Sequence, residues 1–507
     1  MKMQNFRTYL TAIVLLNFVS AQAQDYTESA LFFSRTNPGG SARILGLGGS
    51  QTALGGDYSS ALSNPAGLGF FNRSEFTFSL GLTDHQSSAN YLGTHAEDNR
   101  SVFNIPGISY VWHLPKRDDN SFFGGSLGIS LSRVNDFNRS TLYRGNNQNN
   151  SIIDYFIDQA RGETTDQFFE TQFPNYNTPT ALAYFNYLIG PTSILDPPGP
   201  EDEYFTDASY PFQQEEIVVK GASNQWSISY GGNLKDKFFF GGGIGITSLR
   251  YKSQKILTET FDSDTLENLQ LVENLNIQGT GINATLGAIV RPVNFLQFGL
   301  SYTTPTFYGL SETWDGSMSS RWNNFDYYGD GETILGDNSD NPEETEIVTS
   351  EYNFTAPMKL RGGVAFITKY GFLTADVEMI NPSKGKYRST EASISFGGEN
   401  ENIQAVYQPV INYRIGAEFR KDIFRVRAGY GVQSNTYNNN VDADNTITSI
   451  SGGAGIRTQR FYVDLAVVHS ASKAYQYQPY TFSDGSGPVV DLKDKTLNGL
   501  ITVGFTF

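Results

Sequence analysis

Few residues in this chain have the types and spacing that enzyme chemistry requires. The sequence contains no cysteine, which excludes disulfides, thiolate zinc sites and a cysteine nucleophile. It also lacks the HExxH, GxSxG and GxxxxGK(S/T) motifs. We therefore predict a protein that is not an enzyme and that holds no metal or other cofactor. The four histidines are scattered at His85, His95, His113 and His469.

Charged residues that alternate with apolar ones are the other candidates for chemistry. In Phe424–Tyr430 (FRVRAGY), Arg425 and Arg427 lie on one face of an extended chain. Two guanidinium groups there could hold a substrate carboxylate, although such arginines more often pair with acidic residues. We predict that a single interior contains Arg361, Asp376, Glu378, Arg414, Glu418, Arg425, Arg427 and Asp464.

The segments that carry these charges alternate with a period of two, as β-strands do. In the last one, Leu497–Phe507 (LNGLITVGFTF), most apolar residues fall on one face. The chain contains fourteen such segments, and the connectors between them are alternately short and long. The segments are 74–83, 103–114, 120–133, 224–234, 236–255, 269–291, 294–313, 346–368, 371–380, 403–419, 422–436, 445–458, 460–472 and 497–507.

An even number of strands, with tight turns at one end and long loops at the other, is typical of an outer-membrane β-barrel. A strand of about ten residues at a tilt of about 40° covers the ~25 Å apolar layer. We therefore predict an all-β fold, a fourteen-stranded antiparallel barrel over residues 74–507 with its charged face in the lumen. The longest predicted extracellular loop is 134–223.

The N-terminus and the composition agree with export. Residues 1–23 combine Lys2 and Arg7 with the apolar stretch Leu10–Val19 and an Ala-Gln-Ala site, which predicts a signal peptide. Aromatic residues make up 14% of the 507 residues and the net charge is −16, so the chain is neither disordered in composition nor suited to bind nucleic acid. We expect it in the outer membrane of a Gram-negative bacterium.

Residues 24–73 lack sustained alternation and precede the first strand. Because glycine allows close backbone packing, the simplest location for this glycine-rich segment is inside the barrel, as a plug. Its motifs are Gly39–Arg43 (GGSAR), Gly46–Gly49 (GLGG), Ala53–Asp57 (ALGGD) and the run Asn64, Pro65, Ala66, Gly67 and Leu68. This block resembles the N-terminal hatch of the FadL/TodX family of outer-membrane transporters, in which Asn-Pro-Ala ends the hatch just before the first strand.

The resemblance implies passive uptake of hydrophobic small molecules such as fatty acids or aromatic hydrocarbons. It implies capture among the outer loops, passage to a site near the hatch, and lateral release into the membrane through a gap at a kinked third strand. Gly124 and Gly125 in the third strand are the candidate kink, and Pro106-Gly107 in the second strand is another interruption. In loop 134–223, predicted helices at 151–160 and 178–189 carry Tyr155, Phe156, Phe185 and Tyr187, which either form a capture surface or pack the loop on itself.

Two other functions remain open at this point. A non-transporting barrel of the same family, such as the PorV component of the type IX secretion system, would bind a secretion machine. An outer-membrane lipase or protease would need a nucleophile beside His113 or His469. For a transporter we expect a monomer whose partners are a hydrophobic ligand, outer-membrane lipid and lipopolysaccharide, and the barrel assembly machinery. The last of these partners is expected because a final strand that ends in the aromatic residue Phe507 resembles the assembly signal of outer-membrane barrels.

Overall fold

The computed structural model describes residues 23–507 except 36, 116–123, 171–172, 175–176, 196, 207, 264, 392–393 and 442. Apart from Ala23, the predicted signal peptide lies outside the described residues. None of the described helices is both long and apolar enough to cross a membrane.

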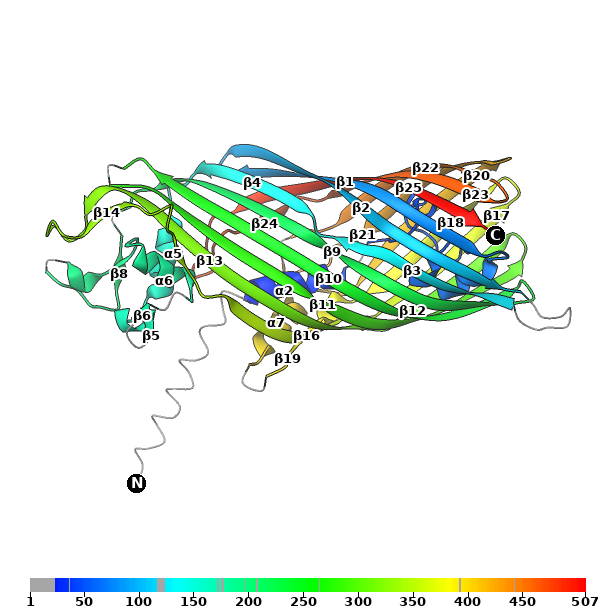
Figure 1. The fold of residues 1–507 in the computed structure, drawn as a ribbon, viewed down its shortest axis with the longest axis horizontal. Helices are drawn as coiled ribbons and strands as arrows, with labels where there is room; N and C mark the ends of the chain where they lie inside the picture. The colour runs from blue at the N-terminus through cyan, green and yellow to red at the C-terminus, as the bar shows by residue number, and fades with distance from the viewer. Residues whose placement is uncertain are drawn as a thin grey trace, which may run out of the picture.

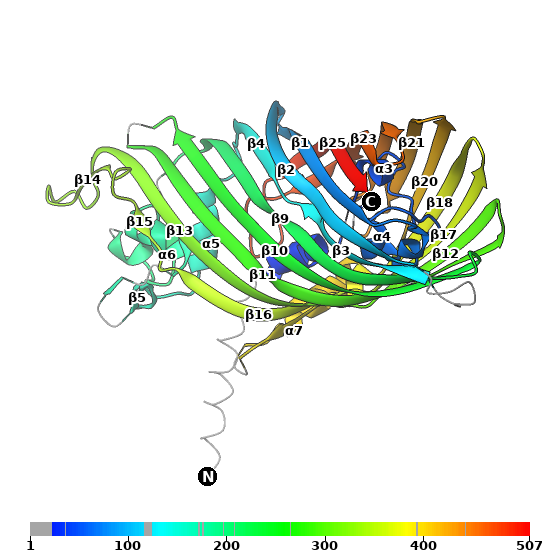
Figure 2. The same ribbon diagram turned by 45° about the vertical axis from the view of Figure 1, so that its right-hand side comes forward.

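The strands form a closed antiparallel barrel of fourteen wall strands, which confirms the predicted fold class (Figures 1 and 2). Four wall strands consist of two segments each. In order around the wall they are β1 (Glu75–Tyr91), β2 (Thr94–Leu114), β3 (Gly124–Asp136) with β4 (Arg139–Asn146), β9 (Pro211–Leu234), β10 (Phe238–Phe261), β11 (Leu266–Val293), β12 (Leu296–Thr303) with β13 (Thr306–Asp326), β16 (Val348–Ala356) with β17 (Lys359–Thr368), β18 (Gly371–Ile380) with β19 (Lys386–Ser389), β20 (Val410–Lys421), β21 (Phe424–Gln433), β22 (Ile447–Arg457), β23 (Phe461–Ser472) and β25 (Val490–Thr506).

The remaining elements lie in the N-terminal segment and in the outer connections. The N-terminal segment contains α2 (Ala23–Ser34), α3 (Ala42–Leu45), α4 (Ser60–Ser63) and the 3₁₀ helix η1 (Pro65–Phe70). The outer connections contain α5 (Ile152–Ala160), η2 (Thr165–Phe168), β5 (Phe169–Glu170), β6 (Phe173–Pro174), α6 (Pro179–Phe185), β7 (Gly190–Pro191), η3 (Thr192–Ile194), β8 (Tyr204–Phe205), β14 (Ile334–Asp337), β15 (Glu343–Glu344), η4 (Pro382–Lys384), α7 (Gly397–Val406) and β24 (Tyr475–Tyr477).

The first and last strands close the ring. β1 pairs with β25 in unbroken register from Glu75 opposite Thr506 to Tyr91 opposite Val490. Beyond this ladder, Ser74 and Phe507 exchange two backbone hydrogen bonds of 3.1 and 3.0 Å. The seam therefore leaves no free sheet edge between the two ends of the wall.

The wall is apolar outside and polar inside. Large apolar side chains are exposed on strands all around it, whereas acidic residues, arginines, serines and threonines of the same strands are buried. A continuous apolar exterior is the pattern of a barrel surrounded by lipid, and it places this chain in the outer membrane of a Gram-negative cell. Examples are Leu82, Phe103, Trp226, Ile246, Ile282, Phe298, Leu373, Ile415, Val426, Ile450, Leu465 and Phe505.

Several strands are longer than predicted. The connector expected at 84–102 is a continuation of β1 and β2, which are joined by a tight turn at Leu92-Gly93. This hairpin is rich in polar residues, so period-two alternation does not reveal it. Residues 403–406, expected as the start of a strand, form the end of α7 instead.

Candidate functional site

Residues 37–71, here called the hatch segment, lie inside the barrel (Figure 2). The helix α3 contacts β22, β23 and β25, whereas η1 contacts β3, β9, β10 and β11 on another part of the wall. The amide of Ala42 donates to Thr502 Oγ1 at 2.8 Å, and Ser229 Oγ donates to the carbonyl of Ala61 at 2.9 Å. The hatch segment is thus hydrogen-bonded to widely separated wall strands.

The run Asn64–Leu68 forms a buried turn against the wall. Asn64 Oδ1 accepts from the amide of Ala66 at 3.2 Å and caps η1, in which Pro65 occupies the first position. Asn64 Nδ2 donates to the carbonyls of Thr52 at 2.7 Å and Ala288 at 3.3 Å. The side chains of Ala66 and Leu68 are fully buried, and a Cβ on Gly67 would clash with Ser60 Oγ. Small residues and one amide therefore fasten this turn to β11.

Glycines of the wall make room for the hatch segment. A Cβ at Gly287 would clash with Asn64 Oδ1, one at Gly299 with the carbonyl of Thr52, and one at Gly429 with the amide of Gly48. The sequence motifs do not single out this set. Its signal is glycine at lumen-facing positions of otherwise apolar, alternating strands.

The first group of buried lumen charges surrounds Glu378. Its carboxylate pairs with Arg361 Nε at 2.6 Å and Arg414 Nη2 at 3.0 Å. On the same strand, Asp376 Oδ2 accepts the backbone amides of Gln51 and Thr52, at 2.7 and 2.8 Å. This group therefore holds three wall strands and the hatch segment together.

The second group centres on Arg427, which pairs with Glu418 and Asp464 at 2.6 Å each. Arg43 of the hatch segment lies 3.7 Å from the same Glu418 carboxylate. Arg425 points elsewhere: it donates to the carbonyls of Asp422 and Phe424, at 2.6 and 2.8 Å. Because Arg427 is buried between two acids, the pair Arg425–Arg427 does not form a carboxylate clamp.

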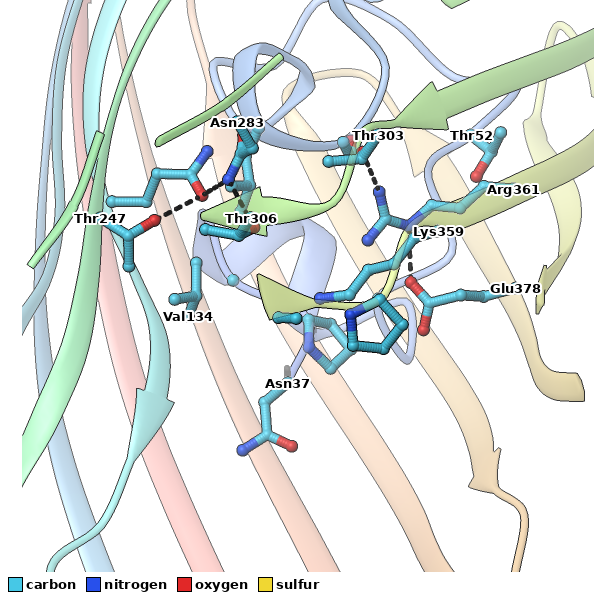
Figure 3. A pocket seen from close by; sticks show the side chains of 18 of the residues that line it. Asn37, Thr52, Val134, Thr247, Asn283, Thr303, Thr306, Lys359, Arg361 and Glu378 are labelled. Atoms are coloured by element: carbon cyan, nitrogen blue, oxygen red, sulfur yellow. Dashed lines mark hydrogen bonds and ion pairs between the residues drawn. The ribbon is translucent and has the colours of Figure 1, made fainter. Parts of the chain in front are cut away.

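A cavity of about 60 Å³ lies between the hatch segment and the wall (Figure 3). Asn37 and Thr52 line it from the hatch side, and Val134 lines it from β3. Its remaining lining is mostly polar and includes Asn283, Thr303, Thr306, Lys359, Arg361 and Arg414. This volume holds a few waters at most, since a cavity that takes up benzene measures about 150 Å³.

The third wall strand bends away from the second beside this cavity. The β2–β3 ladder ends at Gly107 opposite Ser132, although β2 itself continues outward to Thr94. Beyond that point the carbonyl of Val134 accepts from the amide of Asn37, at 2.9 Å. Asn135 Nδ2 donates to the carbonyls of Phe32 and Arg35, at 3.1 and 3.3 Å. At this level β3 is bonded to the N-terminal segment instead of to β2.

The bend is not at the predicted glycines. Gly124 and Gly125 pair in regular register with Asn233 and Gly232 of β9. The register shifts between Arg133 and Asn135 instead, and β4 resumes at Arg139. The shift therefore lies within the predicted strand but at Asn135, whose side-chain amide bonds to the N-terminal segment, and not at the glycines. The β1–β2 ladder also shifts, between Ser79 and Gly81, opposite the predicted interruption at Pro106.

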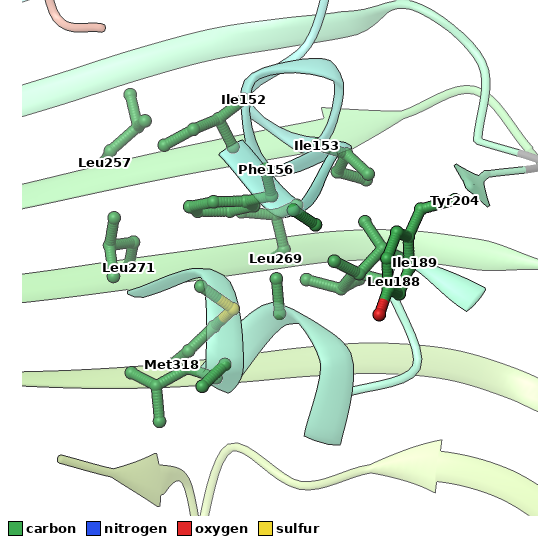
Figure 4. Packing of buried hydrophobic residues seen from close by; sticks show 14 of the residues in the cluster. Ile152, Ile153, Phe156, Leu188, Ile189, Tyr204, Leu257, Leu269, Leu271 and Met318 are labelled. Atoms are coloured by element: carbon green, nitrogen blue, oxygen red, sulfur yellow. The ribbon is translucent and has the colours of Figure 1, made fainter. Parts of the chain in front are cut away.

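The aromatic residues of the outer loop divide into two kinds. Phe156 of α5 is fully buried in the core of the loop, with Leu269 and Met318 of the extended wall strands (Figure 4). Tyr155, Phe185 and Tyr187 are half-buried, and the last two rings lie 5.3 Å from Phe169 and 4.9 Å from Tyr327. Burial raises the pKa of Tyr155 to about 12. Phe156 thus packs the loop, and the other three keep part of their surface accessible.

Neither of the two candidate histidines, His113 and His469, forms an ion pair with an acidic residue in the part of the chain that the structure describes. His113 Nδ1 lies 3.4 Å from Ser126 Oγ, but no described acidic residue bonds to this histidine. His469 is exposed on β23. The described residues also contain no group of three or more His, Asp or Glu that could hold a metal ion.

Comparisons with known proteins match the fold rather than the sequence. No protein-family model and no curated protein matches the chain. Its structure is similar to that of a FadL homologue of Pseudomonas aeruginosa, with a TM-score of 0.54 and 12% identity over 93% of this chain and 99% of that one. The toluene transporters TodX of Pseudomonas putida and TbuX of Ralstonia pickettii match with TM-scores of 0.48, at 12% and 13% identity, over 92% of this chain and 98% of theirs. The match to the P. aeruginosa structure shows that the chain has a FadL-like fold.

Proposed function

We propose that this chain is a passive transporter of hydrophobic small molecules across the outer membrane, with the hatch segment as its plug and the bend in β3 as the exit into the lipid. The observation that carries the proposal is the cavity that lies between the hatch segment and this bend. The shared fold supports it, since the P. aeruginosa structure is that of a FadL homologue. A lateral exit suits such a solute because each CH₂ moved from water to lipid gains ~0.8 kcal/mol.

The charges around the cavity favour a solute with an anionic end. Lys359, Arg361 and Arg414 line it together with Asp376 and Glu378. A carboxylate bound there would accept charge-assisted hydrogen bonds from the ammonium and guanidinium groups, which an arene cannot do. A long-chain carboxylic acid therefore fits the lining better than a neutral arene. At about 60 Å³ the cavity is too small for either, so binding requires the hatch segment to move.

The test is to join the hatch segment to the bend in β3 with a disulfide, so that the two cannot move apart. The side chains of Asn37 and Asn135 are hydrogen-bonded at 3.2 Å, and the chain has no cysteine, so in the double variant Asn37→Cys with Asn135→Cys the only intramolecular disulfide that oxidation can form joins these two positions. We expect the oxidised form to take up labelled oleate much more slowly than wild type, and a reductant to restore uptake. The matched control is Ser449→Cys with Ser470→Cys, a directly opposed pair on β22 and β23.

Unchanged oleate uptake in the oxidised double-cysteine variant, with the disulfide verified by mass spectrometry, would contradict release at this bend. Toluene and oleate are compared in the same cells, and faster uptake of toluene would contradict the anionic preference. A barrel that takes up neither solute and co-purifies with a secretion apparatus would support the alternative, a PorV-like partner.

A further inference from the structure

Three exposed cations lie close together as a patch on the outer surface of the wall. They belong to β9 and β10, which run side by side (Figure 1). Lys220 of β9 lies directly opposite Lys252 of β10, and Arg250 is two residues along β10 on the same face. All three side chains are exposed. The next strand, β11, places Asn276 opposite Lys252 and Gln278 opposite Arg250, so these positions add amides and no acid.

This arrangement lacks a counter-ion within the protein. Like charges directly opposite each other destabilise a strand pair. None of the three side chains forms an ion pair or hydrogen bond with another described residue. Three unpaired neighbours of one sign are unusual in a chain of net charge −16, in which acidic partners are abundant. An anion supplied from outside would remove the repulsion.

The position of the patch along the membrane normal indicates the source of that anion. On these strands the exposed apolar belt ends at Trp226, Ile246 and Ile282. Arg250 follows Ile246 by four residues on the same face, which is about 13 Å along the strand and about 10 Å along the membrane normal at a tilt of about 40°. The tight turn between β9 and β10 is at the other end, so the patch lies on the extracellular side, just outside the hydrocarbon.

We infer that Lys220, Arg250 and Lys252 bind a phosphate group of lipid A, the lipid anchor of lipopolysaccharide, in the outer leaflet. A phosphate between the opposed lysines pairs with both ammonium groups, and the guanidinium of Arg250 adds a charge-assisted hydrogen bond. The site faces the lipid and not the lumen, so it does not depend on transport. It gives the barrel a specific lipid neighbour in addition to the non-specific contact of the belt.

The test compares the binding of two lipids to the detergent-purified barrel. The probes are diphosphoryl lipid A and its dephosphorylated form, which has the same acyl chains. The variant is Lys220→Gln with Lys252→Gln, and the control is Lys237→Gln with Lys421→Gln, two exposed lysines at the tight turns on the opposite side of the membrane. We expect about tenfold weaker binding of diphosphoryl lipid A to the variant, unchanged binding to the control, and weak binding of the dephosphorylated lipid to all forms.

Equal binding of diphosphoryl lipid A to wild type and variant would overturn the site, and so would equally tight binding of the dephosphorylated lipid. Displacement of lipid A by inorganic phosphate alone would show a site for free anions and would overturn the lipid assignment. Oleate uptake is measured in the same variant and is expected to match wild type. Loss of lipid binding with normal uptake thus separates this inference from the proposed function.

Discussion

The backbone amide of Asn37 donates to the carbonyl of Val134 at 2.9 Å, and this bond joins the hatch segment to the bend in β3. Val134 lies just beyond the point where β3 stops pairing with β2. The hatch segment is therefore bonded to β3 at a point where β3 does not pair with β2. Movement of the hatch segment and opening of the wall are expected to be coupled here.

Substitution of Asn135 by alanine should loosen this junction. The variant removes the donor that serves the carbonyls of Phe32 and Arg35, at a cost of about 1–3 kcal/mol. Hydrogen exchange followed by mass spectrometry should then be faster in peptides covering residues 31–39 and 132–138. Asn353→Ala, at an exposed wall position, is the control. Equal protection in both variants would show that Asn135 does not hold the bend.

Substitution of Glu378 by glutamine should strongly destabilise the barrel. It leaves the buried Arg414 and the half-buried Arg361 without their carboxylate, which costs about 3–5 kcal/mol. The matched variant is Asp337→Asn, which breaks the exposed pair with Arg321 and should cost less than about 1 kcal/mol. Urea unfolding in lipid vesicles measures both changes. Similar losses in the two variants would contradict a structural role for the buried group.

An alanine at Gly429 should displace the hatch segment. Its Cβ would clash with the amide of Gly48, whereas an alanine at Gly362 meets nothing closer than Val377 Cγ2 at 3.7 Å. We expect Gly429→Ala to raise single-channel conductance in planar bilayers and Gly362→Ala to leave it unchanged. Deletion of residues 37–70 sets the upper limit. If that deletion does not change the conductance, the hatch segment is not the plug.

Removal of the cap of α5 should free part of the outer loop without affecting the barrel. Ser151 Oγ accepts from the amide of Ile153 at 3.0 Å and also bonds to Glu259 of β10. Ser151→Ala should cost about 1 kcal/mol and increase proteolysis within 151–189 of the folded protein. Ser248→Ala, exposed on β10, is the control. Equal cleavage of both variants would mean that this cap does not anchor the loop.

The sequence allowed the number of strands and their inward faces to be predicted, because lipid on one side and polar side chains on the other impose alternation on every membrane-spanning segment. Outside the membrane this constraint disappears. The hairpin through Leu92 is rich in polar residues and was therefore predicted as a loop. The extent of the strands beyond the lipid thus depends on pairing between neighbours, which a single segment does not reveal.

The candidate site was predictable only in part, for a similar reason. Alternation placed Arg425 and Arg427 on the lumen face but could not show that one binds turn carbonyls and the other two acids. The bend in β3 was expected at glycines, whereas it lies at Asn135, whose side chain bonds to residues about a hundred positions away. Contacts of such sequence separation follow from barrel closure and not from local pattern.

The seam between β1 and β25 joins residues that are far apart in the chain, from Glu75 opposite Thr506 to Tyr91 opposite Val490. Pairing across such a sequence separation is intrinsically slow. The enclosure of the hatch segment within a continuous wall therefore depends on one of the slowest contacts of the fold.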